Sequence, residues 1–202
     1  MTAPNPGGGG ATKQSAEASS ARRAARVFSG VGRLRDGTPV WVRPLVAGDR
    51  GLLLAGFSGL SRRSRGSRFL HGVSDAQFER MLPVLLDTVD QQSHLALLLY
   101  ADGQPIGVGR LRRFTSDAGV ADLAVTVADD WQGRGAGTVL AREVLACAGN
   151  VREIQTVVNA DNSASLRMLA RLGDLRSDCA SGDCDVVVRV SGFPAAMGAE
   201  AT

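Results

Sequence analysis

The fold is decided by the stretch Trp131-Gln132-Gly133-Arg134-Gly135-Ala136-Gly137, which follows an apolar run at 123–127 and precedes a helical pattern at 136–149. The apolar run predicts a buried strand. A glycine-rich turn from a strand into a helix leaves backbone N–H groups unpaired at the helix start, where the helix dipole is positive. Glycine also lets the backbone approach an anion closely. The stretch therefore predicts binding of a pyrophosphate.

The glycine spacing excludes two common nucleotide-binding motifs. No Lys-Ser or Lys-Thr pair follows the last glycine, so this is not a Walker A loop. Gly133, Gly135 and Gly137 alternate, whereas the dinucleotide fingerprint has its third glycine three places after the second. An alternating glycine run also fits an ordinary loop, so its assignment depends on a second signal.

That second signal lies further along the chain. Asn159-Ala160-Asp161-Asn162-Ser163 opens another predicted helix, which we expect to end at Leu172-Gly173. Together with Gln132-x-x-Gly135-x-Gly137 after an apolar strand, this segment resembles the acyl-CoA signature of the GNAT N-acetyltransferases. The resemblance runs from about Asp36 to Gly173. Within the family it favours the bacterial protein-lysine acetyltransferases that act on acyl-CoA synthetases.

The pattern along the chain predicts one GNAT domain at 27–192, with a disordered tail at 1–26 and a frayed tail at 193–202. The first tail is rich in Gly, Ser and Ala and has too few large apolar side chains to offset the entropy of ordering. Strands are expected at 40–43, 94–100, 105–112, 121–127, 154–158, 174–178 and 185–190, and helices at 48–60, from 75 onward, at 136–149 and at 162–172. Hairpin turns are expected at Asp102-Gly103 and around Ser181-Gly182, and Ser74 with Gln77 is expected to cap the helix that follows. Residues 62–68 form an arginine-rich link. The order matches an α/β (α+β) GNAT fold, a mixed twisted sheet of about six to seven strands with helices on both faces.

The resemblance implies acetyl-CoA as cosubstrate. In the family, the strand before the glycine loop and the next strand splay apart, and pantetheine pairs with the open edge. By position, the backbone of Val125 and Val127 would hold pantetheine, and the N–H groups of 132–137 the pyrophosphate. The implied cofactor-binding residues are Val125, Val127, Gln132, Gly133, Arg134, Gly135, Ala136, Gly137, Thr138 and Asn162. Arg134 would contact phosphate or be solvated; Asn162 would contact the cofactor or simply cap its helix.

Asp122 is the candidate general base. A lysine amine has a pKa near 10.4, so attack at neutral pH benefits from a base. Asp122 is the lone acid in the apolar strand 121–125, where partial burial would favour that role. The alternative is a carboxylate that points into water. Asp130 is a second candidate, expected in the loop, and the N–H of Val125 would stabilise the oxyanion. In the resembled enzymes a glutamate usually stands at the position of Asp122.

The acid that protonates the leaving thiolate has no evident candidate. Many GNAT enzymes use a tyrosine on the second helix, but residues 166–170 contain none, and the only tyrosine is Tyr100. Water or Ser165 would have to assist. Met168 is expected to be core packing. A catalytically weak acyl-CoA-binding sensor or interaction module is therefore the alternative to an enzyme.

Composition narrows the partners. The net charge of +3 suits anionic ligands but is too small for the dense basic face of a nucleic-acid binder. No apolar run is long enough to span a membrane. With three cysteines, two histidines and no CxxC pair, no metal site is expected. Cys147 should be core, and Cys179 and Cys184 should face each other across a hairpin. We expect a cytoplasmic protein whose acceptor is an amine, on a protein lysine or a small molecule. The arginines at 62–68 would guide an acidic protein surface or the cofactor phosphates, or be merely solvated.

Overall fold

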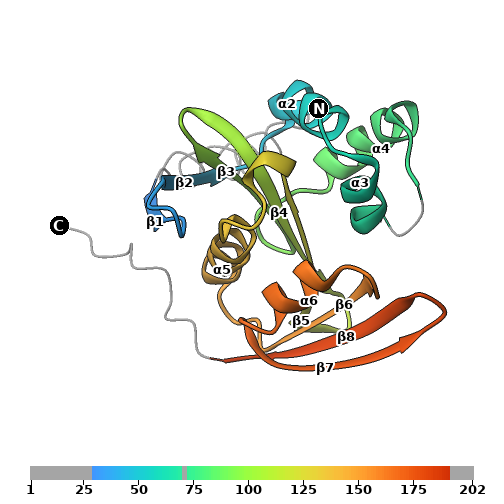
Figure 1. Cartoon of the computed structure of the whole chain (residues 1–202). Coiled ribbons are helices and arrows are strands. Elements are labelled where there is room, and N and C mark those ends of the chain that lie inside the picture. The colour runs from blue at the N-terminus through green and yellow to red at the C-terminus, as the bar shows by residue number, and fades with distance from the viewer. Residues whose placement is uncertain (1–28, 70–71, 192–202) are drawn as a thin grey trace, which may run out of the picture.

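The computed structural model describes residues 29–69 and 72–191, which build one eight-stranded sheet in the order β1-β2-β3-β4-β5-β6-β8-β7 (Figure 1). The strands are β1 (Ser29–Arg33), β2 (Pro39–Pro44), β3 (His94–Ala101), β4 (Gln104–Phe114), β5 (Asp117–Val127), β6 (Glu153–Asn159), β7 (Gly173–Ala180) and β8 (Asp183–Val190). The helices are η1 (Ala47–Asp49), α2 (Arg50–Ser58), α3 (Arg62–Phe69), α4 (Asp75–Asp87), η2 (Asp129–Trp131), α5 (Ala136–Ala148) and α6 (Ser163–Leu169). The mixed sheet confirms the expected fold, with β1 as an additional strand. The expected tails at 1–26 and 193–202 lie outside the described residues.

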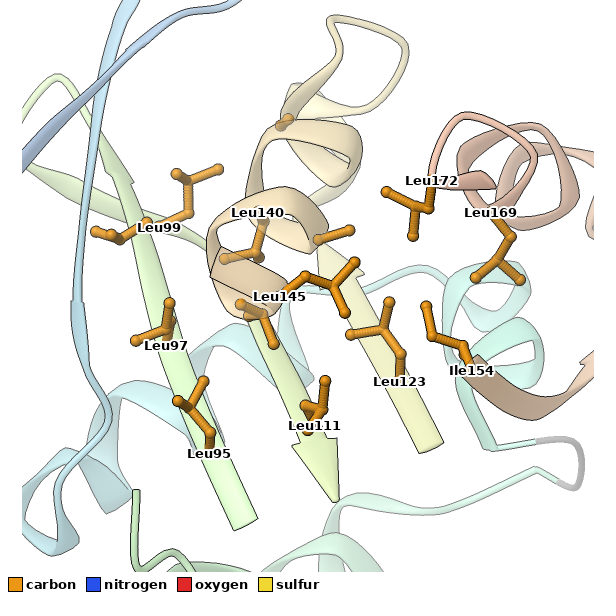
Figure 2. Close-up of a cluster of buried hydrophobic side chains, with 14 of the residues drawn as sticks. Leu95, Leu97, Leu99, Leu111, Leu123, Leu140, Leu145, Ile154, Leu169 and Leu172 are labelled. Carbon is orange, nitrogen blue, oxygen red and sulfur yellow. The ribbon is translucent and has the colours of Figure 1, made fainter. Parts of the chain in front are cut away.

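Side-chain alternation along the strands gives the sheet two different faces. Leu95, Leu97 and Leu99 of β3 pack on the face that α5 covers, in the main core (Figure 2). Ala96 and Leu98 pack on the opposite face, which α4 covers. On the α5 face, a Cβ at Gly109 of β4 would meet Leu140 and Val144 at 2.9 Å, so only glycine lets α5 lie this close to the sheet.

The strands β5 and β6 diverge near the centre of the sheet. They pair in parallel only at Val120↔Glu153 and Ala121↔Ile154, although β5 stays paired with β4 and β6 with β8. The Gly119 carbonyl accepts from Arg152 N–H at 2.9 Å, on the β6 side of β5. Because backbone groups alternate along a strand, the amides of Leu123, Val125 and Val127 point to the same side, where no strand covers them.

The segment at 62–68 is a helix, not the expected link. It lacks the apolar spacing that predicts helices, and all of its described side chains are at least partly exposed. Its start is stabilised from elsewhere in the chain, because Asp129 accepts from the N–H of Ser61 at 2.7 Å. The Ser61 hydroxyl oxygen also accepts from the N–H of Ser64 at 3.2 Å, a serine cap that is a weak local signal for this helix start.

The helix predicted at 162–172 ends at Leu169, and Gly173 is the first residue of β7 rather than a helix stop. After the helix, Arg171 N–H donates to the Met168 carbonyl oxygen and Leu172 N–H to that of Leu169. These bonds span three residues instead of four, so the chain is wound more tightly there. A Cβ at Gly173 would lie 1.9 Å from the Arg189 carbonyl oxygen. This glycine is therefore required for close approach of β7 to β8.

Both predicted hairpins are confirmed. Asp102-Gly103 and Ser181-Gly182 adopt positive φ at all four residues, which is the geometry of a tight two-residue turn. Cys179 and Cys184 face each other across the second hairpin and form a disulfide bond. Cys147 packs against the main core, and burial raises the pKa of its thiol.

Candidate active site

The glycine loop opens α5 with a left-handed backbone. Gly133 has φ +75° and Gly135, the N-cap, has φ +94°, values that disfavour any residue with a Cβ. No side chain caps the helix, so the first N–H groups of α5 have no side-chain acceptor. The loop therefore offers the unpaired, positively polarised amides that bind phosphate.

The Gln132 side chain orders this loop from within. Its Nε2 lies 3.1 Å from the Val127 carbonyl oxygen, 2.9 Å from Asp129 Oδ1 and 3.1 Å from Ser64 Oγ. Asp129 also accepts from the Ser64 hydroxyl at 2.5 Å. Burial raises the pKa of Asp129, but the hydrogen bonds from Ser64 and Ser61 together lower it by more, so the pKa lies below its usual value. These contacts fasten α3 to the loop.

A first cavity of about 630 Å³, here called the loop cavity, lies against these amides. The expected cofactor residues that line it are Val125, Val127, Gln132, Gly133, Gly135, Ala136, Gly137, Thr138 and Asn162. Its lining also includes Arg35, Arg63, Arg68, Arg167 and Arg171. Sequence reasoning missed Arg35, Arg167 and Arg171. Arg167 and Arg171 are four residues apart in the helix predicted at 162–172, and this spacing was a usable signal that both side chains lie on one face.

Arg134 does not line the loop cavity. Its Nη1 lies 3.4 Å from Asp36 Oδ2, and its Cζ lies 4.8 Å from the centre of the Trp131 ring. The side chain is thus held by the turn before β2 and by its own loop. The structure gives the Arg134 side chain partners within the protein, and its contact with the cofactor stays a prediction.

A second cavity of about 700 Å³, the acceptor cavity, lies beyond the first. Its lining includes Asp122, Arg112, Phe69 and residues of β6. Six residues line both cavities and therefore mark their junction: Ser67, Arg68, Val125, Asn162, Ser165 and Met168. The junction lies where β5 and β6 diverge. Met168, expected only as core packing, both packs against the core and faces the cavities.

Asp122 lies half-buried in the acceptor cavity, directly opposite Arg112 in the β4–β5 ladder. It forms no ion pair or hydrogen bond with any described residue, although its charge attracts Arg68 and Arg110. Asp130, the second candidate base, is exposed in η2 and lines neither cavity.

A buried histidine holds Arg110 beside Asp122. Arg110 Nε and Nη2 lie 3.1 Å and 2.9 Å from His94 Nε2. Because a guanidinium only donates, Nε2 accepts and the proton of the neutral ring is on Nδ1, 3.0 Å from Thr88 Oγ1. Burial and the charge of Arg110 both lower the pKa of His94, which keeps the ring neutral.

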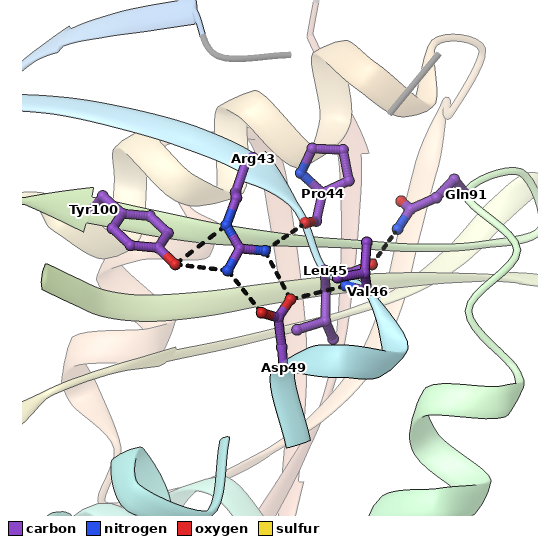
Figure 3. A network of polar contacts seen from close by, with 7 residues as sticks. All are labelled: Arg43, Pro44, Leu45, Val46, Asp49, Gln91 and Tyr100. Carbon is purple, nitrogen blue, oxygen red and sulfur yellow. Dashed lines mark hydrogen bonds and ion pairs between the residues drawn. The ribbon is translucent and has the colours of Figure 1, made fainter. Parts of the chain in front are cut away.

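Tyr100 is far from the chemistry. Its hydroxyl accepts from Arg43 Nη2 at 2.7 Å, and Arg43 also pairs with Asp49 (Figure 3). Tyr100 lines neither cavity. Ser165 lies at the junction, and its N–H donates to Asn162 Oδ1 at 3.1 Å. Asn162 is therefore the N-cap of α6, and it also faces both cavities, so its two interpretations are compatible.

Among the described residues, three or more His, Cys, Asp or Glu side chains nowhere gather as they would around a metal ion. None of the helices in this part of the chain is long and apolar enough to cross a membrane.

Comparison with known proteins assigns the family. Residues 60–174 match the model of the acetyltransferase (GNAT) family. An acetyltransferase of Pseudomonas aeruginosa is 34% identical over 169 residues, which cover 79% of this chain and 88% of that protein. Acetyltransferase Pat of Mycolicibacterium smegmatis is 31% identical over 145 residues, 70% of this chain but only 43% of the relative, so the chain spans less than half of that protein.

Solved structures share the fold. The GNAT domain of S. lividans PAT superposes with a TM-score of 0.68 at 22% identity, covering 78% of this chain and 94% of that one. Mycobacterium smegmatis RimJ in complex with CoA-disulfide gives a TM-score of 0.57 at 19% identity, covering 79% and 85%. The family-model match and the Pseudomonas relative, with which the glycine loop and the diverging strands agree, show that the chain belongs to the GNAT family of N-acetyltransferases.

Proposed function

We propose that this N-acetyltransferase moves the acetyl group of acetyl-CoA directly to a lysine side chain of a protein. The observation that carries the proposal is the meeting of two cavities where β5 and β6 diverge, with Asp122 on the acceptor side and the glycine loop on the other. The relatives named Pat and PAT support a protein acceptor.

The loop cavity fits the cosubstrate. The free amides at the start of α5 would bind its pyrophosphate, and Arg35, Arg63, Arg167 and Arg171 would add charge for its phosphates. Uncovered amides on Val125 and Val127 would pair with pantetheine as an added strand does. The Val127 carbonyl is shared with Gln132 Nε2, so its N–H is the freer group.

The chemistry then follows from the junction. The neutral amine attacks the thioester carbonyl carbon, the C–N bond forms and the C–S bond breaks. Asp122, directly or through one water, takes the proton that the amine loses. The N–H of Val125 would stabilise the oxyanion. The thiolate takes a proton from water or from the Ser165 hydroxyl, because Tyr100 is held elsewhere.

The test is turnover against affinity in Asp122→Asn. With acetyl-CoA and a lysine peptide, we expect CoA release to fall by about 10²- to 10⁴-fold, the usual contribution of a general base. The dissociation constant for acetyl-CoA, measured by calorimetry, should stay within about twofold because Asp122 lines only the acceptor cavity. The control is Asp130→Asn, which changes an exposed aspartate that lines neither cavity and should keep full turnover.

The second candidate function is an acyl-CoA-binding module with little catalysis. The absence of a tyrosine from α6 and the shorter base favour it. Wild-type protein that binds acetyl-CoA but releases no CoA with any amine would establish this module and overturn the transferase. We also propose a cytoplasmic location. The cytoplasm keeps thiols reduced, so we expect the Cys179–Cys184 disulfide of the structure to be reduced to two thiols there.

A further inference from the structure

The acceptor cavity carries more positive than negative charge. Its ionisable lining is Arg68, Arg112, Arg113 and a single carboxylate, Asp122. Arg110 does not line the cavity, but its charge also interacts with Asp122. An ammonium group entering alone would meet net repulsion there.

Two of these arginines have no hydrogen-bonding or ion-pair partner among the described residues. The Arg113 guanidinium donates to the carbonyls of Gln92, Ala118 and Ala148, which gives it a structural role. Arg110 is held by His94. In the part of the chain that the structure describes, neither Arg68 nor Arg112 forms a side-chain hydrogen bond or an ion pair.

Arg68 packs beside Phe69, with its Cζ 4.9 Å from the centre of the ring. Burial, together with repulsion from Arg110, lowers its pKa to about 10 although Asp122 attracts it. A desolvated guanidinium without a bonded anion is unfavourable, and a carboxylate that binds it restores the lost interaction. Arg68 lies half-buried at the junction, whereas Arg112 is exposed at the outer side. Anion-binding groups thus lie at two depths of one cavity.

From this arrangement, and resting on the function proposed above, we propose that the acceptor is a lysine in an acidic stretch of polypeptide, whose neighbouring carboxylates bind Arg68 and Arg112. The carboxylates offset the repulsion that the ammonium meets, and guanidinium–carboxylate pairs orient the peptide. Two arginines at different depths suit an extended chain better than a small ligand with one carboxylate.

The experiment uses the full chain, acetyl-CoA and three peptides of equal length in which one lysine is flanked by Glu, by Gln or by Lys. We expect kcat/KM to be about tenfold higher for the Glu peptide than for the Gln peptide, mainly through KM, and lowest for the Lys peptide. The advantage should shrink as salt rises. Arg112→Gln should bring the Glu/Gln ratio toward one, and Arg112→Glu should reverse the order. Arg176→Gln, which removes an exposed charge outside both cavities, should leave the ratio unchanged.

The outcomes separate the two proposals. Acetylation of all three peptides at one rate, or a ratio that Arg112→Gln does not change, overturns the acidic acceptor and leaves the transferase intact. No CoA release with any peptide overturns the transferase and this inference with it. Faster acetylation of free amino acids than of the Glu peptide overturns the polypeptide acceptor.

Discussion

Two charged clusters lie on the same face of the sheet and differ in how their carboxylates are paired. The ladder pairs Arg43 with Leu98, and Arg112 with Asp122, placing both clusters on the face opposite α5. Asp49 accepts two hydrogen bonds of 2.7 Å from Arg43 and one of 2.9 Å from Val46 N–H. Asp122 accepts none from any described residue.

The contrast separates charges that hold the fold from charges available to a ligand. Arg43 is satisfied at every guanidinium nitrogen, by Asp49, by Tyr100 and by the Pro44 carbonyl (Figure 3). The pair joins β2 to the start of α2 and faces no cavity. Asp122, Arg68 and Arg112 instead have no hydrogen-bonding or ion-pair partner among the described residues.

The largest expected effect tests the closed pair. Asp49→Ala should lower the free energy of unfolding by about 3 kcal/mol, because it leaves the Arg43 charge largely buried and unpaired. Asp122→Asn should change it by less than about 1 kcal/mol, since no bonded partner is lost. Urea denaturation measures both. The double variant Arg43→Met with Asp49→Leu should recover part of the loss, and equal losses in the two single variants would contradict the distinction.

Local pattern predicted the elements whose determinants are adjacent in sequence. The glycine loop, α5, the two tight hairpins and the Ser74 capping box of α4 each depend on residues within a few positions. Nine of the ten residues that the resemblance implied for the cofactor line the loop cavity, because a strand, a turn and a helix fix their relative positions; their contact with the cofactor stays a prediction.

The rest depends on contacts between distant segments. Asp129 bonds to the start of α3, Asp36 pairs with Arg134, and the Arg189 carbonyl oxygen leaves room only for glycine at position 173. The N–H of Arg35 donates to the Arg134 carbonyl oxygen at 3.0 Å, which holds Arg35 against the glycine loop and at the loop cavity. No spacing rule along one segment encodes such pairings, so they became visible only with the fold.

Asp129 extends the comparison between satisfied and unsatisfied carboxylates. Like Asp49 it accepts several hydrogen bonds, but it lines the loop cavity. Asp129→Asn should weaken acetyl-CoA binding by about tenfold, since an amide cannot accept all the hydrogen bonds from Ser61, Ser64 and Gln132. Calorimetric titration with acetyl-CoA measures the change. Asp130→Asn, one residue away and outside both cavities, should bind normally; an equal loss there would indicate a general effect of loop charge.

The smallest effect is in acid. Burial raises the pKa of Asp49, but the bonds from Arg43 and Val46 N–H lower it more, so its folded pKa is below the unfolded value near 4. A depressed folded pKa stabilises the protein above the unfolded pKa, and that stability is lost as pH falls through the folded pKa. Between these values, wild type should lose stability more steeply with falling pH than Asp49→Asn, by up to about 1.4 kcal/mol per pH unit. Denaturant titrations at closely spaced acid pH values distinguish the slopes, and identical slopes for wild type and Asp49→Asn would remove the basis for treating Asp49 as the paired member of the comparison.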